Sequence, residues 1–368
     1  MKKNYFMLAA AALMFAACAE TDFVNPVPVN EGEAIGFDTY AQLPTRATEN
    51  NNGEYSDAIY AHHNDFAVWA YKNTSDVLVF GTNATTGTAV NAQTYAYGDP
   101  KYWDKTADNY YFYAAAPVTT ADPQWKLNGV TDIATQANGY FTIDDVLLAA
   151  TNFRTTPNGT ATTTFKGLGD IDYMIAAPCT DKFTTVSLHF IHILSRLNII
   201  AKKATGLTPD PTITLNSVKV YGINLKGSFD ESDAVATTAG SIARWTPAST
   251  PVTTNQYAYT SDLALSTSGQ YVIEGLVIPQ QVAYTSTLKS DGTGDKAKPY
   301  MEVIYTINGE EFKAYYNLAD VFNGNTTDNI AFNEGWQNTL TITISPAGIA
   351  FEGNVSTWSE NPGDQPIM

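Results

Sequence analysis

The sequence predicts an all-β fold of antiparallel sandwiches, and composition and spacing support this prediction. The chain has 22 Tyr and 17 Phe but only 15% charged residues, and aromatic and β-branched side chains suit pleated, half-buried surfaces. Short apolar runs recur along the chain with Pro, Gly and Asn between them, and no internal repeat of fixed period is visible. Such spacing indicates antiparallel sandwiches. With 368 residues, the chain is long enough for two domains of ordinary size.

The chain begins with a predicted lipoprotein signal peptide, residues 1–17. Lys2 and Lys3 precede an apolar run at residues 6–17 that ends in small residues directly before Cys18. This run is shorter than the roughly 20 residues that a membrane-spanning helix needs, and its charged front is typical of a cleaved secretory signal. The small residues before Cys18 resemble a bacterial lipobox, in which the thiol is acylated. The alternative is an ordinary signal peptide followed by a chance cysteine.

Cysteine content argues against an internal disulfide, and net charge restricts the classes of partner that the exported chain can bind. With lipid on Cys18, Cys179 has no partner, so we expect no internal disulfide. We interpret Cys179 as a small buried residue, because nothing near it in the sequence would lower its pKa. The net charge is −17, or −19 once Lys2 and Lys3 leave with the signal. Nucleic acid and anionic membrane surfaces are disfavoured as partners, because both recruit basic patches.

Residues 18–46 are predicted to form a linker and one strand ahead of the first domain. The linker ends near residue 34, and the segment 35–43 (IGFDTYAQL) then alternates with a period of two. The residues that share its core-facing side are Ile35, Phe37, Thr39, Ala41 and Leu43. Pro44 closes this strand, and the polar residues 45–57 should form an exposed loop.

The first domain is predicted to span residues 47–182. Three runs are apolar on both faces, as expected of strands inside a sandwich: 65–71 (DFAVWAY), 109–116 (NYYFYAAA) and 172–177 (DYMIAA). We expect Trp69 and Phe112 to be largely buried there. The Thr- and Gly-rich stretches 82–98 and 155–169 are interpreted as surface loops.

The second domain is predicted to span residues 183–368. Residues 186–202 (VSLHFIHILSRLNIIAK) fit a helix or a strand, and the recurring Ile, Val and Phe favour a strand. Residues 213–222 are expected to return as its hairpin partner. Further strands are predicted at 271–278, 300–307, 311–316, 339–344 and 349–358.

The sequence offers little for catalysis or cofactors. His189 and His192 have a spacing close to that of a metal site, but on a strand they point to opposite faces. Acidic pairs such as Asp144 with Asp145 are most simply solvated turn residues. No nucleophile elbow or nucleotide fingerprint is present. We therefore expect no cofactor, no metal and no enzymatic activity; whether a loop binds calcium stays open.

Several motifs in order resemble the fimbrillin-like family of pilus and surface proteins. Their positions in this chain are Cys18, residues 35–47, Trp103, residues 111–113, Pro117, and residues 190–197, 278–280, 332–335, 340–345, 348–349, Val355 and Trp358. The order and spacing of these motifs carry the resemblance, which extends over most of the chain. A departure is Trp336, at a position where relatives have a Tyr-like residue.

The resemblance implies two transthyretin-like β-sandwich domains in tandem and delivery to the outer membrane as a surface-exposed, palmitoylated lipoprotein. It also implies that an arginine-specific protease cuts between Arg46 and Ala47, which removes the strand 35–43. Arg46 is one of only four arginines and lies in the predicted loop. Subunits of the pilus, copies of this chain or related fimbrillins, would then join by strand exchange and support adhesion.

Two other functions compete with a stalk or tip subunit of a pilus. One is a lipid-anchored surface protein that binds a glycan or a host ligand and does not polymerise, with aromatic rings at 95–103 or 245–259 as stacking platforms. The other is an enzyme. A polymerising subunit loses residues 18–46, whereas a lipid-anchored binder keeps them.

Overall fold

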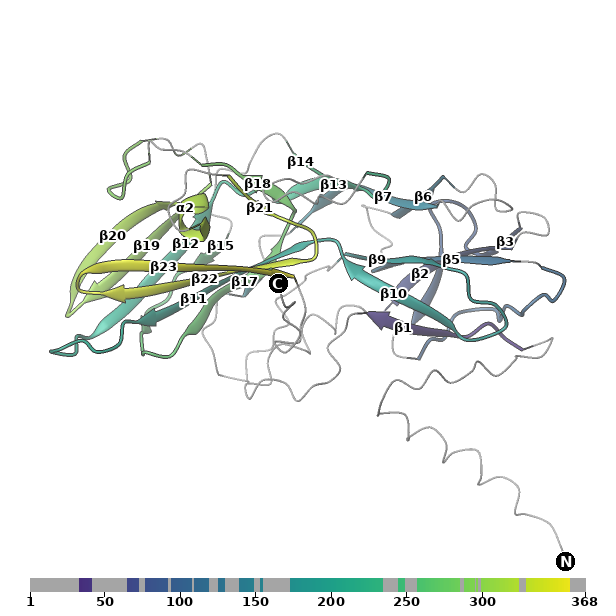
Figure 1. Cartoon of the computed structure of the whole chain (residues 1–368), viewed down its shortest axis with the longest axis horizontal. Helices are drawn as coiled ribbons and strands as arrows, with labels where there is room; N and C mark the ends of the chain where they lie inside the picture. The colour runs from purple at the N-terminus through teal and green to yellow at the C-terminus, as the bar shows by residue number, and fades with distance from the viewer. Residues whose placement is uncertain are drawn as a thin grey trace, which may run out of the picture.

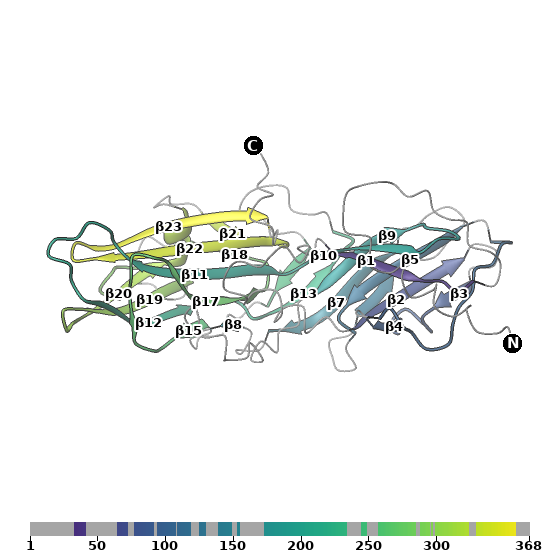
Figure 2. The ribbon, with the colours of Figure 1, turned by 90° about the horizontal axis from the view of Figure 1, so that it is seen from below.

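The computed structural model confirms an all-β protein. It describes residues 33–41, 65–72, 77–91, 94–107, 109–118, 125–129, 139–148, 153–154, 173–233, 244–248, 257–284, 288–294, 296, 299–323 and 329–357. The strands form two sandwiches at opposite ends of an elongated molecule (Figure 1 and Figure 2). Within the described residues the only helix is the short α2 (Leu318–Asn323).

The first sandwich has a seven-stranded sheet and a four-stranded sheet. The seven-stranded sheet contains β1 (Phe37–Ala41), β2 (Asp65–Lys72), β3 (Val77–Phe80), β4 (Thr88–Asn91), β5 (Tyr110–Ala116), β9 (Met174–Cys179) and β10 (Val186–His192). The four-stranded sheet contains β6 (Trp125–Asn128), β7 (Tyr140–Leu147), β13 (Lys226–Asp230) and β14 (Trp245–Pro247). Trp69 of β2 packs on Phe141 of β7 with ring centroids 5.3 Å apart, so the two sheets meet face to face.

The second sandwich has two five-stranded sheets and a short pair. The β11 sheet contains β8 (Phe153–Arg154), β11 (Ser195–Lys203), β17 (Gln270–Val277), β22 (Trp336–Ser345) and β23 (Gly348–Thr357). The β12 sheet contains β12 (Ile213–Tyr221), β15 (Tyr257–Tyr259), β16 (Leu263–Ala264), β19 (Tyr300–Ile307) and β20 (Glu310–Asn317). The remaining pair is β18 (Gln280–Val282) with β21 (Ile330–Phe332). Among the described pairings, β1 with β10 and β11 with β22 are parallel.

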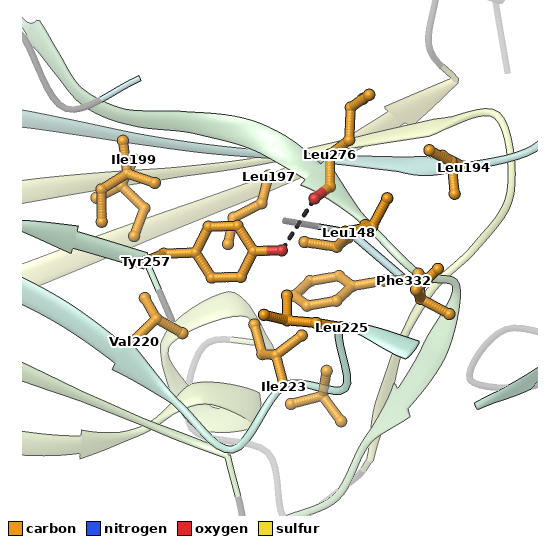
Figure 3. Packing of buried hydrophobic residues seen from close by; sticks show 14 of the residues in the cluster. Leu148, Leu194, Leu197, Ile199, Val220, Ile223, Leu225, Tyr257, Leu276 and Phe332 are labelled. Carbon is orange, nitrogen blue, oxygen red and sulfur yellow. Dashed lines mark hydrogen bonds between the residues drawn. The ribbon is translucent and has the colours of Figure 1, made fainter. Parts of the chain in front are cut away.

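One apolar core runs through both sandwiches. It extends from Trp69 and Phe141 in the first to Ile342 in the second. In the second sandwich, Figure 3 shows Leu197 and Ile199 of β11 facing Val220 of β12 across the core, where Tyr257 donates a 2.9 Å hydrogen bond to the Leu276 carbonyl. These residues are 0–3% exposed, which is what close packing between two sheets requires.

Strand pairing crosses the predicted domain break at residue 182. β10 lies after the break yet pairs with β9 and β1, and β13 pairs with β7. In the other direction, β8 pairs with β17 of the second sandwich. The division into domains at 47–182 and 183–368 stays a prediction, and the strand pairing does not follow it.

The segment 186–202 is a strand, as predicted, but its expected hairpin does not form. The segment divides into β10 and β11 at Ile193 and Leu194, which are fully buried where the chain passes between the two sandwiches. β11 pairs with β17 and β22, while β12 pairs with β15, β16 and β19. The hairpin prediction was wrong because β11 and β12 belong to opposite sheets across the core.

The strands predicted to form the first core are confirmed. Trp69 is 1% and Phe112 0% exposed, and both faces of β2 are buried. In contrast, residues 82–98, expected to be a loop, contain β4. Residues 155–169 lie outside the described residues.

Phe112→Ala should lower the free energy of unfolding by about 3–5 kcal/mol, because it removes a buried ring and leaves a cavity. Phe312, which is 37% exposed on β20, provides the matched control. Chemical denaturation of both variants measures the difference. Equal losses for Phe112→Ala and Phe312→Ala would contradict the packing described for β5.

Candidate functional site

The strand nearest the start of the chain is joined to the first sandwich at the edge of its larger sheet. β1 runs parallel to β10, in a register from Phe37 opposite Val186 to Ala41 opposite Phe190. The Val186 N–H donates a 2.9 Å hydrogen bond to the Gly36 carbonyl. β1 thus covers the edge of β10 that faces away from β9.

The side chains of this segment complete an aromatic core. Ile35 is 1% and Phe37 4% exposed. The ring of Phe37 lies edge-on to four others, with centroid distances of 6.5 Å to Phe66, 5.2 Å to Phe80, 5.7 Å to Tyr97 and 6.1 Å to Phe112. Such edge-to-face contacts add to the apolar burial. The first sandwich therefore depends on a strand that precedes all its other strands in the chain.

Alternation correctly predicted the inward faces of Ile35 and Phe37, which are buried while Gly36 and Asp38 are exposed. The side chains of Thr39 and Ala41 are not among the described ones, although the backbone of both lies in β1. Leu43, Cys18, Arg46 and Ala47 lie outside the described residues. Lipidation at Cys18, cleavage after Arg46 and removal of the strand stay predictions.

The sulfhydryl group of Cys179 is unsuited to nucleophilic chemistry. Cys179 is half-buried at the end of β9, and its thiol donates to the Asp181 carboxylate at 3.1 Å. Burial raises the pKa of Cys179 to about 12, so the thiol stays protonated at neutral pH. The interpretation of Cys179 as a small buried residue is only partly met, because its side chain is half-buried.

His189 and His192 do lie on opposite faces of β10, the first exposed and the second 8% exposed. Across the part of the chain that the structure describes, no three His, Cys, Asp or Glu side chains gather as metal ligands would. The described residues likewise contain no helix long and apolar enough to cross a bilayer.

The rings considered as glycan platforms are mostly core residues. Trp103 and Trp245 are each 3% exposed, and Tyr257 and Tyr259 are 1% and 0% exposed. A buried ring has no free face on which a sugar can stack, so the expectation is wrong for these four residues. Tyr102, at 54%, is exposed.

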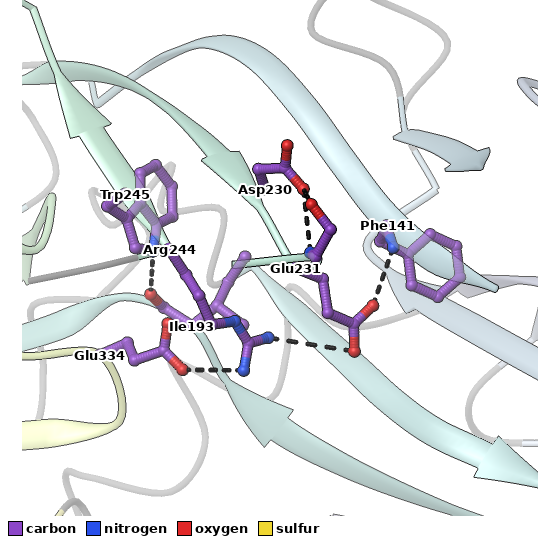
Figure 4. Close-up of polar contacts among 8 residues, drawn as sticks. Phe141, Ile193, Asp230, Glu231, Arg244, Trp245 and Glu334 are labelled. Atoms are coloured by element: carbon purple, nitrogen blue, oxygen red, sulfur yellow. Dashed lines mark hydrogen bonds and ion pairs between the residues drawn. The ribbon is translucent and has the colours of Figure 1, made fainter. Parts of the chain in front are cut away.

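A buried group of charges lies where the two sandwiches meet (Figure 4). Arg244, directly before β14, contacts Glu334 in the β21–β22 turn at 3.2 Å and Glu231 after β13 at 4.0 Å. Its guanidinium carbon lies 4.8 Å from the centroid of the Phe229 ring. The adjacent Trp245 indole donates a 2.7 Å hydrogen bond to the Ile193 carbonyl, which fixes β14 against the chain crossing.

Two carboxylates share this single arginine, so the group carries one excess negative charge when both are ionised. Burial is the largest effect on Glu334 and raises its pKa to about 7, although Arg244 opposes the shift. Burial also raises the pKa of Glu231. Protonation of Glu334 leaves one positive and one negative charge in the group, so its net charge is then zero.

The fold and this edge define a class of protein: an elongated pair of β-sandwiches in which an N-terminal strand fills an aromatic cluster of the first. The fimbrillin-like family model matches residues 45–358, and the chain belongs to this family. It is a pilus or adhesion subunit of the cell surface, a class whose role is structural. β1 lies before the matched range.

Solved structures with a similar fold have low sequence identity. A fimbrial protein from Bacteroides vulgatus is 16% identical, with 89% of this chain and 100% of that chain covered and a TM-score of 0.41. The tip fimbrial protein Mfa3 from Porphyromonas gingivalis is 10% identical, with coverages of 82% and 96% and a TM-score of 0.36. At these scores the likenesses add nothing to the family assignment. No curated protein matches the chain.

Phe37→Ala should destabilise the first sandwich by about 3–5 kcal/mol, because the ring fills a site enclosed by four other rings. Asp38→Ala, on the exposed face of the same strand, provides the control and should change stability by less than about 0.5 kcal/mol. Denaturant unfolding followed by tryptophan fluorescence measures both. If Phe37→Ala is as mild as Asp38→Ala, the core does not depend on β1.

Glu334→Gln should remove a pH dependence of stability. Because the pKa of Glu334 is raised from 4.5 to about 7 in the folded chain, its stabilising protonation is complete below about pH 4.5 and lost as pH rises to about 7. The loss is about 3 kcal/mol. The stability of Glu334→Gln relative to wild type should therefore increase from pH 5 to pH 8. A difference between wild type and Glu334→Gln that stays constant in thermal melts from pH 5 to pH 8 would contradict the assignment.

Proposed function

We propose that this chain is a structural subunit of a surface pilus that assembles by strand exchange. In this proposal it is exported as a lipoprotein precursor, acylated on Cys18 and held at the outer membrane. A protease cuts after Arg46, so that Ala47 becomes the first residue. The strand of residues 35–43 then leaves, and a strand from another subunit replaces it.

The burial of Ile35 and Phe37 is the observation that carries this proposal. Both residues lie before Arg46 in the chain, so a cut there would leave their strand attached by non-covalent contacts alone. Burying two such side chains stabilises by about 1.5–3 kcal/mol each. This is a large share of the net stability of a domain, about 5–15 kcal/mol.

Loss of the strand would leave an unfilled site that favours another strand. The rings of Phe66, Phe80 and Phe112 would lose the neighbour that Phe37 provides. One edge of β10 would have unpaired backbone donors and acceptors. Apolar surface beside an open sheet edge is the arrangement that binds an added strand.

The last described strand repeats the pattern of the first. Residues 35–38 read Ile-Gly-Phe-Asp and residues 349–352, in β23, read Ile-Ala-Phe-Glu. In both segments the Ile and the Phe share one face, with a small residue between them and an acidic residue after them. β23 of a second copy therefore has the side chains that the site of β1 accepts.

Exchange would also improve the burial of β23. Ile349 and Phe351 are only half-buried at the edge of the β11 sheet, and Val355 is 44% exposed. In the register of β1, Phe351 would lie opposite Val186. Pairing with β10 would replace part of the ladder that β23 forms with β22.

The competing function is a lipid-anchored surface protein that binds a glycan or host ligand and keeps residues 18–46. The buried state of Trp103, Trp245, Tyr257 and Tyr259 gives it little support. The fate of residues 18–46 distinguishes the two functions.

Arg46→Ala should keep the protein full-length and monomeric in the presence of an arginine-specific protease, whereas wild type should begin at Ala47 and form higher oligomers. Size-exclusion chromatography measures the oligomeric state, and N-terminal sequencing identifies the first residue.

A paired cysteine test fixes the register of the donated strand: Ser187→Cys and Glu352→Cys, in a Cys179→Ser background, should form an intersubunit disulfide. In the uncut chain Ser187 is opposite Asp38 and Glu352 is opposite Thr341.

Glu310→Cys, exposed on β20, replaces Glu352→Cys in the control pair and should not crosslink to Ser187→Cys. If wild type is cut after Arg46, loses its strand and remains monomeric, the chain is not a strand-exchanging subunit. Oligomers that form without the Ser187–Glu352 crosslink would show that a different segment is the donor.

A further inference from the structure

The N-terminal strand has a second partner on the side opposite β10. This is the segment between β4 and β5, residues 94–107, here named the strap. The Ile35 N–H donates a 2.7 Å hydrogen bond to the Lys101 carbonyl, and the Trp103 N–H donates to the Glu33 carbonyl at 3.4 Å. An antiparallel bridge joins Ala34 to Tyr102 between them. The start of the segment is thus paired with the strap and its later part with β10.

A side chain of the strap also binds the backbone of the strand. The Tyr97 hydroxyl donates a 2.5 Å hydrogen bond to the Ile35 carbonyl. The ring of Tyr97 lies edge-on to Phe37, with centroids 5.7 Å apart. Burial raises the pKa of Tyr97 above its usual value, so the hydroxyl keeps its proton at neutral pH. Tyr97 therefore contacts both the backbone and the aromatic side chain of the strand.

The far end of the strap is fixed to the sheet through Asp104. Its carboxylate accepts from the Lys72 ammonium of β2 at 2.6 Å and from the Thr106 hydroxyl at 2.6 Å. Its backbone N–H donates a 2.7 Å hydrogen bond to the Tyr110 hydroxyl of β5. Lys72, followed by Thr106, holds the pKa of Asp104 well below its usual range. At neutral pH the carboxylate is ionised, so this attachment is complete.

We propose that the strap is a latch over the strand-exchange site, that it must open before the N-terminal strand can leave, and that the Lys72–Asp104 pair holds it closed. This inference rests on the proposed function. The physical reason is that a segment paired on both edges cannot separate from β10 while the strap still binds Ile35. Lys72, Asp104 and Tyr97 are then positioning residues for strand exchange.

The strap also selects the strand that replaces β1. Tyr97 offers a hydroxyl to a carbonyl at the position of Ile35 and a ring edge to an aromatic side chain at the position of Phe37. The partner that fits is an extended polypeptide with an aliphatic residue, any residue and then an aromatic residue. Ile349 and Phe351 of a second copy meet this requirement.

Amide hydrogen exchange in the uncut full chain tests the latch without requiring assembly. Asp104→Asn and Lys72→Met should speed exchange of the Ile35 and Trp103 amides about two- to fivefold, the range expected when one such ion pair is lost. Amides of the β2–β5 ladder, such as Phe112, should be unchanged. Lys72→Arg preserves the charge and should behave as wild type.

Lys126→Met provides the matched control, because Lys126 forms a 2.6 Å pair with Asp144 elsewhere in the first sandwich. It should leave the Ile35 and Trp103 amides unchanged. A general loss of stability would instead speed exchange of the Phe112 amide in parallel, and that result would overturn the latch.

A second measurement follows release of the strand and growth of oligomers after proteolysis at Arg46. Both should be faster in Asp104→Asn by the same factor as amide exchange. If Ile35 and Trp103 exchange at wild-type rates in both variants, or if cut chains of all variants assemble equally fast, the latch is wrong while the proposed function stands. If amide hydrogen exchange at Ile35 and Trp103 is faster but cut chains never assemble, the latch stands and the proposed function fails.

Discussion

The insertion of Phe37 among four other rings is the contact on which the first sandwich depends. β2, β3 and β5 each contribute an aromatic ring to this site, and Tyr97 closes it from the strap. The strand that carries Phe37 precedes the other strands of this sandwich in the chain. If the chain were cut between residues 41 and 65, only non-covalent contacts would hold Phe37 in this site.

The second constraint is the crossing at Ile193 and Leu194. Both residues are fully buried, and the chain there leaves β10 of one sandwich and enters β11 of the other. The Trp245 indole and the backbone N–H of Gly335 bind the two carbonyls of this crossing. The crossing is thus tied to β14 on one side and to the β21–β22 turn on the other, and the Arg244 group of charges lies between these two elements.

Local sequence pattern was sufficient where a strand is apolar or strictly alternating. It predicted β2 and β5, the inward faces of Ile35 and Phe37, and the strand character of residues 186–202. It could not predict which strands pair, because pairing depends on contacts far apart in sequence: β13 pairs with the distant β7 as well as with its neighbour β14, and β12 faces β11 instead of pairing with it. The strap was missed because Tyr97 and Trp103 lie in a polar, turn-rich stretch. The correspondence between residues 35–38 and 349–352 was visible in the sequence, but a search for repeats of fixed period does not detect two short segments at opposite ends.

The positions of β1 and β23 have a geometric consequence. They lie on different sandwiches of an elongated molecule (Figure 2), so a contact between the site of one and the strand of the other is heterologous: it uses two unlike surfaces of each copy. Such a contact does not close on itself unless the rotation between copies completes a ring. Every added copy presents the same free surface as the one before it. If copies join through this contact, growth is directional, and the contact itself sets no limit on the number of copies.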